Sequence, residues 1–139
     1  MGINIKKTIR ATLNEFYSLD EFTSRLSVGQ SETYEDLNEF LGNKSEKKIG
    51  NNTVLRRLSN GDIAVRLWNT DIVVINKLDN KKIYSGGWET RTTADRINQF
   101  LPDGVGLFTK KGKWVVKANN GLFDFRGGMI ITSSGDALV

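Results

Sequence analysis

The chain of 139 residues contains no cysteine and no histidine. Without cysteine, disulfide bonds and thiolate metal ligands are excluded. Without histidine, Ser-His and Cys-His nucleophile pairs, histidine-ligated zinc and an imidazole base at neutral pH are also excluded. The carboxylates of the second half stand singly rather than in pairs. We therefore expect a protein that is not an enzyme and that needs no metal ion or cofactor.

Long apolar runs are also missing. No stretch approaches the roughly 20 residues that a membrane span requires, and residues 1–10 lack the pattern of a signal peptide. Hydrophobic residues make up 38% and charged residues 26% of the chain, which is typical of a globular domain. We expect a cytoplasmic protein without a membrane partner.

The net charge of +4 is unevenly distributed along the chain. Residues 1–50 hold seven Lys and Arg against eight Asp and Glu, whereas the remainder holds thirteen against eight. The second half therefore favours an anionic partner.

The first 42 residues show the apolar spacing of short helices. Apolar residues recur at helical spacing over residues 4–16, a capping-box pattern at Ser18 restarts a helix, and another at Thr33 predicts a third helix that Gly42 ends. Such short helices must bury their apolar stripes on the sheet of the same chain or on a second copy. We favour a second copy for part of this arm, and hence a homodimer or a higher homo-oligomer.

The pattern changes to a period of two at Thr53. The predicted fold is α+β, with N-terminal short helices followed by an antiparallel β-sheet core into which one short helix is inserted. The predicted organisation is a helical arm (1–42), a linker (43–52), a ligand-binding core (53–132) and a loose tail (133–139). The predicted strands are 53–58, 63–68, 71–76, 82–85, 106–110, 113–118, 122–125 and 129–132.

Residues 84–102 combine several features of a binding site. Gly86 and Gly87 permit a positive φ, so that Trp88 is displayed from a bend. Thr92 begins a capping-box pattern, which predicts a helix from about residue 93 that Pro102 ends. The N-terminus of a helix suits a phosphate. A bulge with a core tryptophan and a short helix that covers the sheet would also explain this stretch.

The candidate binding residues are a stacking aromatic, phosphate donors and an amide that reads a base edge. Two strand arginines belong to the set as well, although the usual position of such residues is the solvated face. The complete set is Trp88, Arg91, Thr92, Arg96, Asn98, Arg126, Arg57 and Arg66.

The resemblance of this chain to known proteins rests on two segments. The segments Arg-Leu-x-Asn-Thr-Asp-Ile-Val (66–73) and Ser-Gly-Gly-Trp-x-Thr-x-Thr-Thr-x-x-Arg-Ile-Asn (85–98) are similar to a group of small proteins common in tailed-phage genomes. They also resemble the phage anti-Thoeris sponges. The resemblance implies oligomers that sequester a cyclic ADP-ribose isomer, glycocyclic ADP-ribose made by TIR enzymes, in the infected bacterial cell without cleaving it. It further implies that some members hold cyclic oligonucleotides at a separate site.

In that family an aromatic stacks on the adenine and an asparagine ten residues later reads the base edge, which implies these roles for Trp88 and Asn98. Family arginines near the C-terminus grip phosphates, and Arg126 is the matching arginine here. The alternative is a phage nucleic-acid-binding accessory protein, because Trp68, Trp88 and Trp114 alternate with Lys and Arg. A nucleotide hydrolase is a third hypothesis.

Overall fold

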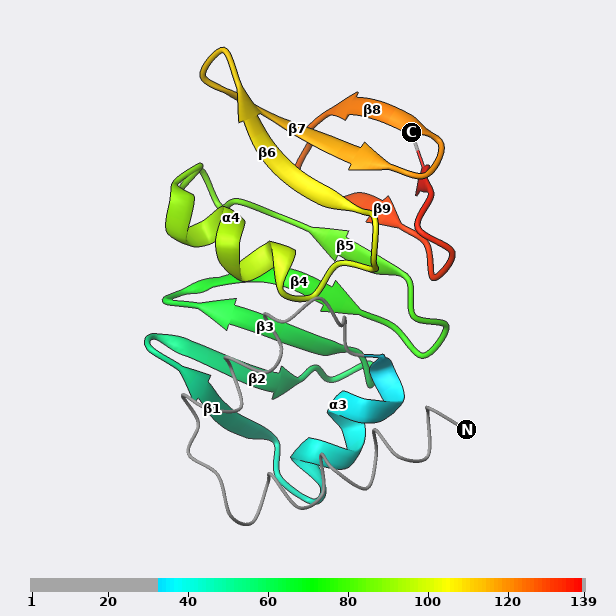
Figure 1. Ribbon diagram of the computed structural model, residues 1–139. Coiled ribbons are helices and arrows are strands. Elements are labelled where there is room, and N and C mark those ends of the chain that lie inside the picture. The colour runs from blue at the N-terminus through cyan, green and yellow to red at the C-terminus, as the bar shows by residue number, and fades with distance from the viewer. Residues whose placement is uncertain (1–32, 139) are drawn as a thin grey trace.

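The structure is a computed structural model, and it describes residues 33–138 (Figure 1). The described part contains two helices, α3 (Tyr34–Leu41) and α4 (Arg91–Asn98). Its strands are β1 (Glu46–Gly50), β2 (Thr53–Arg57), β3 (Ile63–Leu67), β4 (Thr70–Ile75), β5 (Lys81–Ile83), β6 (Gly106–Lys110), β7 (Lys113–Ala118), β8 (Gly121–Asp124), β9 (Met129–Ile131) and β10 (Ala137–Leu138). The helices predicted before residue 33 lie outside the described residues.

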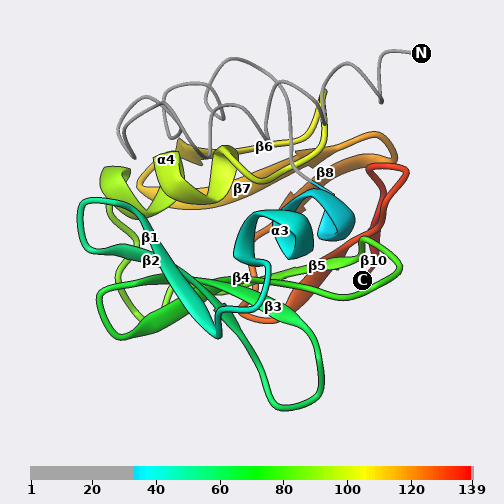
Figure 2. The same cartoon turned by 90° about the horizontal axis from the view of Figure 1, so that it is seen from below.

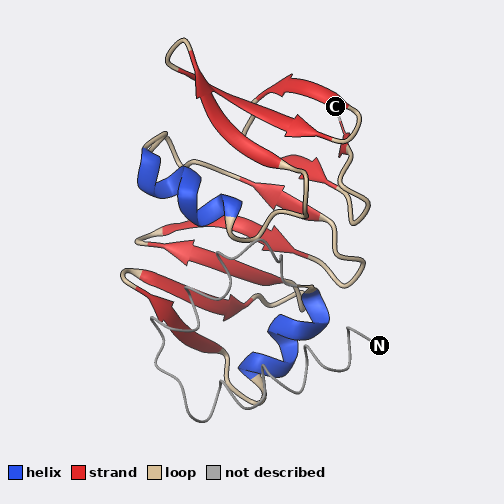
Figure 3. Ribbon diagram, in the orientation of Figure 1, coloured by secondary structure: helices blue, strands red, loops and turns tan. Residues whose placement is uncertain are grey.

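The strands form two antiparallel sheets (Figure 3). The larger sheet has the order β1-β2-β3-β4-β5-β9-β10, and the smaller has the order β6-β7-β8. The meander from β2 to β5 is confirmed. Strand β9 extends it by pairing with β5, with Met129 opposite Ile83. The α+β class is therefore confirmed for the described part.

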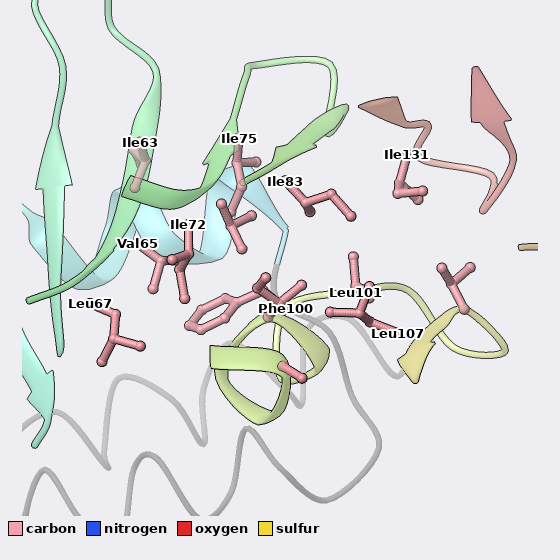
Figure 4. Close-up of a cluster of buried hydrophobic side chains, with 14 of the residues drawn as sticks. Ile63, Val65, Leu67, Ile72, Ile75, Ile83, Phe100, Leu101, Leu107 and Ile131 are labelled. Atoms are coloured by element: carbon pink, nitrogen blue, oxygen red, sulfur yellow. The ribbon is translucent and has the colours of Figure 1, made fainter. Parts of the chain in front are cut away.

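Both helices lie on one side of the larger sheet (Figure 2). The core fills the space between this side of the sheet, α4 and β6, and Phe100 lies at its centre with no exposed surface (Figure 4). Lys81 is also buried there, and its ammonium group donates a hydrogen bond to the carbonyl of Phe100. Among the described residues, neither helix has the length and apolar character that a membrane crossing requires.

The helix α3 forms as its sequence predicts. Thr33 and Asp36 make the reciprocal bonds of a capping box, and Gly42 caps the end at φ 58°. The buried side chains of Leu37 and Phe40 join the core of the same chain. Helix α3 therefore packs on the sheet of its own chain. The predicted homo-oligomer stays a prediction.

Two predicted boundaries are wrong. The predicted linker, 43–52, contains strand β1, which pairs with β2 and buries Ile49. The predicted loose tail, 133–139, contains strand β10, whose Ala137 is buried. The Asn120 amide holds this strand, since it donates to the Ala137 carbonyl at 2.8 Å and accepts from the Ala137 N–H at 2.9 Å.

Candidate ligand-binding pocket

A pocket of about 470 Å³ opens beside the first turn of α4. This volume lies within the range of small-molecule sites. The walls come from the β3–β4 turn, from the turn that follows β5 and from the start of α4. The lining residues are Leu67, Trp68, Asn69, Thr70, Ile72, Ser85, Trp88, Thr90, Thr92 and Thr93. Leu67 and Ile72 also belong to the buried core, where Figure 4 labels them, and they form the floor of the pocket.

Trp88 is displayed by a tight turn. Gly86 and Gly87 have φ values of 62° and 85°, and the Trp88 N–H donates to the Ser85 carbonyl at 2.9 Å. Gly86 also packs so closely on Thr70 that a Cβ atom would lie 2.6 Å from the threonine Oγ1. The predicted positive φ of both glycines is confirmed. The tryptophan is 68% exposed, so the interpretation of Trp88 as a core residue is wrong.

Trp68 also lines the pocket, and the predicted site does not include it. It is also 68% exposed, and its φ of 55° is rare for a bulky residue. Its N–H donates to the Asn52 carbonyl at 2.8 Å, which fixes the backbone at this position. Backbone strain of this kind concentrates at functional sites. The sequence signal is an aromatic residue directly before Asn69, within the turn between β3 and β4.

The helix α4 begins two residues before the predicted start, because Thr90 and not Thr92 is the N-cap. The Thr90 hydroxyl accepts from the Thr93 N–H at 3.2 Å. This leaves Thr92 free of a capping role, and it lines the pocket. The N–H groups of Arg91 and Thr92 lie in the first turn, where a helix offers no acceptor. The Arg91 side chain is 95% exposed beside the pocket, with its Nε 3.8 Å from the Asp95 carboxylate.

Asn98 does not line the pocket. Its amide donates to the Leu107 carbonyl at 2.9 Å and accepts from the Leu107 N–H at 2.8 Å. These two bonds attach the end of α4 to β6. Arg96 is half-buried on the same helix, and its buried Nε has no hydrogen-bond partner within the described residues.

The remaining predicted arginines contact protein groups or solvent away from the pocket wall. Arg57 donates to the side chain of Asn38 and to the Gly42 carbonyl at the end of α3. Arg66 lies 3.2 Å from the Asp71 carboxylate, which it shares with another arginine of the sheet. Arg126 is exposed in the turn before β9. Of the predicted set, the pocket wall contains Trp88 and Thr92, and the binding roles of the other residues stay predictions.

The ten lining residues are all uncharged. Two indole faces and two aliphatic floor residues provide apolar contact, while one amide and five hydroxyls provide donors and acceptors. Such a wall suits a planar ring with polar edges, because aromatic faces stack on rings and hydroxyls adapt to either donors or acceptors. Charged groups of a ligand would lie toward the mouth, where Arg91 and the start of α4 supply positive potential.

Comparison with known proteins places the chain in a family. The family model described as Kyanoviridae Gp96 protein matches residues 32–132, a segment that contains the whole pocket wall. No curated protein and no solved structure matches the chain. Since the family model covers more than half of the sequence, the chain belongs to the Kyanoviridae Gp96 protein family, a family of phage proteins.

Proposed function

We propose that this phage protein is a non-catalytic binder that sequesters a cyclic ADP-ribose isomer made by TIR enzymes. The observation that carries the proposal is the pair of exposed tryptophans, Trp68 and Trp88, on the wall of one pocket. Tryptophan is enriched at interfaces, and exposed aromatic rings in binding sites stack on bases, so a purine is a suitable partner. The resemblance of residues 66–73 and 85–98 to the anti-Thoeris sponges supports the same ligand class.

The proposed ligand would lie with its adenine against the indole faces. The hydroxyls of Thr92, Thr93 and Ser85 would meet the polar edges of the base and ribose. The diphosphate would lie at the mouth, near Arg91 and the free N–H groups of the first turn of α4. A base stacked on an aromatic residue gains about 1–3 kcal/mol, and an arginine–phosphate contact is among the stronger hydrogen bonds.

The uncharged wall supports sequestration rather than hydrolysis. A general acid or base must lie within hydrogen-bond reach of the reacting group, and the lining residues are Trp, Thr, Ser, Asn, Leu and Ile. Binding in such a pocket leaves the ligand chemically intact. We also propose that the protein forms a homo-oligomer with several such pockets in the infected cell. Cyclic oligonucleotides would bind this oligomer at a separate site.

Calorimetric titration with the purified cyclic ADP-ribose isomer tests the pocket assignment. Trp88→Ala and Trp68→Ala should each weaken binding between about 5-fold and 150-fold, whereas Trp88→Phe should retain most of the affinity. Leu78→Ala is the matched control, because Leu78 is a large exposed hydrophobic residue outside the pocket. Unchanged affinity in both alanine variants would refute the pocket assignment.

Nucleic-acid binding at the same tryptophans is the second candidate function. It is favoured by two indole faces exposed to solvent, which would stack on successive bases of a single strand. The third tryptophan of that hypothesis, Trp114, is buried and packs edge-on against Phe125, so its predicted availability for stacking is wrong. Affinity for nucleic acid falls steeply with salt, whereas binding of a small ligand with few phosphates falls little. Salt-dependent affinity for an oligonucleotide that both Trp68→Ala and Trp88→Ala weaken would favour this second candidate.

A further inference from the structure

The positive charge of the chain is concentrated on one hairpin. Strands β6 and β7 with their turn, residues 106–118, are termed here the lysine hairpin. The hairpin contains four lysines and no Asp or Glu, and its charge of +4 equals the net charge of the whole chain. With these four removed, the remaining Lys and Arg residues equal the 16 Asp and Glu residues in number. The lysines are Lys110, Lys111, Lys113 and Lys117.

The four lysines are available to a partner. All four are exposed, and no carboxylate within residues 33–138 forms an ion pair with any of them. The turn between β6 and β7 stands clear of the rest of the described chain at the top of Figure 1. Lys110, Lys111 and Lys113 lie at the end of this projecting hairpin. Their like charges repel one another, and an anionic partner relieves this repulsion.

An aromatic ring lies on the same face of the hairpin as Lys110, Lys113 and Lys117. Residues directly opposite one another in an antiparallel pair share one face of the sheet. Lys110 lies opposite Lys113, and Phe108 lies opposite Val115. Phe108 is 39% exposed, so this face presents a ring bordered by lysines. Asp124 of β8, opposite Val115, adds one negative charge on this face.

We propose that the lysine hairpin binds single-stranded nucleic acid, with its lysines on the phosphates and Phe108 under a base. Proteins that bind single strands combine a positively charged surface with exposed aromatic rings on a sheet. The site shares no residue with the tryptophan pocket, so it adds a second ligand to the one proposed above. A membrane surface is a poorer match, because the tip of the hairpin is Lys111-Gly112 and carries no apolar residue for insertion.

Fluorescence anisotropy of a labelled oligothymidylate of about 15 nucleotides, titrated with the full chain, tests this proposal. Four phosphate contacts predict a loss of affinity of about 50-fold between about 50 and 200 mM salt. Replacing the four hairpin lysines with glutamine should weaken binding at low salt at least about 10-fold and flatten this salt dependence. Phe108→Ala should weaken binding between about 5-fold and 150-fold.

A second quadruple variant controls for net charge. Lys44, Lys48, Lys77 and Lys82 are exposed lysines outside the hairpin, and their replacement with glutamine removes the same charge. Equal losses in the two quadruple variants would overturn the proposal, as would the absence of binding at low salt. Binding to vesicles of phosphatidylserine and phosphatidylcholine, without binding to the oligonucleotide, would overturn it in favour of a membrane surface.

Discussion

Gly86→Ala tests how the pocket is held together. Gly86 has a φ of 62°, and its Cα lies against Thr70, the first residue of β4. A Cβ atom here would lie 2.6 Å from the Thr70 Oγ1 and 2.7 Å from its Cγ2. Because threonine is branched at Cβ and stiff at χ1, both branches must move or the turn that carries Trp88 must shift away from the β3–β4 turn.

The expected cost has two parts. A left-handed backbone costs a residue with a Cβ atom about 1–2 kcal/mol. Overpacking against a fixed neighbour costs about 1–3 kcal/mol. Gly86→Ala should therefore lower the free energy of unfolding by about 2–5 kcal/mol and should weaken ligand binding even where the protein stays folded, since Trp88 moves relative to Trp68.

Gly87→Ala is the matched control. Gly87 has a φ of 85°, but a Cβ atom there would meet no atom within 4 Å. This variant should show the backbone cost alone, about 1–2 kcal/mol, in urea unfolding followed by circular dichroism. Adding Thr70→Ala to Gly86→Ala should restore most of the difference. Equal stability of the two glycine variants would refute the close approach of the two turns.

Three further predictions concern residues outside the pocket wall. Asn98→Ala should lower the free energy of unfolding by about 1–3 kcal/mol, because it removes both bonds to Leu107; an unchanged melting temperature would contradict this. Arg57→Ala should lower the free energy of unfolding by about 0.5–1.5 kcal/mol, because it removes the hydrogen bonds to Asn38 and Gly42. It should leave ligand affinity unchanged, and a weaker calorimetric affinity would show that Arg57 contacts the ligand. Burial, and secondarily the charge of Lys44, lower the pKa of Lys47 below its usual 10.5. The charged form is then disfavoured in the folded state, so stability should rise as the pH increases from that lowered pKa toward 10.5; Lys47→Met should remove this part of the rise in urea midpoints, and an identical pH profile would contradict the assignment.

Most strands of this fold follow from the period-two pattern, because one face of each sheet is buried. The sequence does not predict strand β1, because Ile49 is its only large apolar residue and no apolar–polar alternation is visible. The half-buried position is filled by Lys47, whose ammonium group lies 4.4 Å from the Phe40 ring centroid. Strand β10 was missed because two residues carry no periodicity, and its pairing depends on Asn120, which is distant in the sequence.

The pocket was predictable only in part. The glycine pair predicts the bend that exposes Trp88. That Trp68 lines the same pocket depends on the pairing of β3 with β4 and on the contact between Gly86 and Thr70. Sequence spacing alone does not show whether an asparagine reads a base or holds the backbone. The Asn98 amide binds the backbone of β6. Local sequence predicts which residues are displayed, whereas the tertiary pairing decides which of them meet.

Capture and release of the signal tests the proposed function most directly. The purified protein would be incubated with the TIR-made cyclic ADP-ribose isomer and removed by filtration, and the filtrate would be assayed before and after the protein is heated. We predict that the signal leaves the filtrate, returns chemically intact on heating, and stays in the filtrate with Trp88→Ala. A signal that stays in the filtrate with the unaltered protein, or that returns chemically changed, would contradict the proposal.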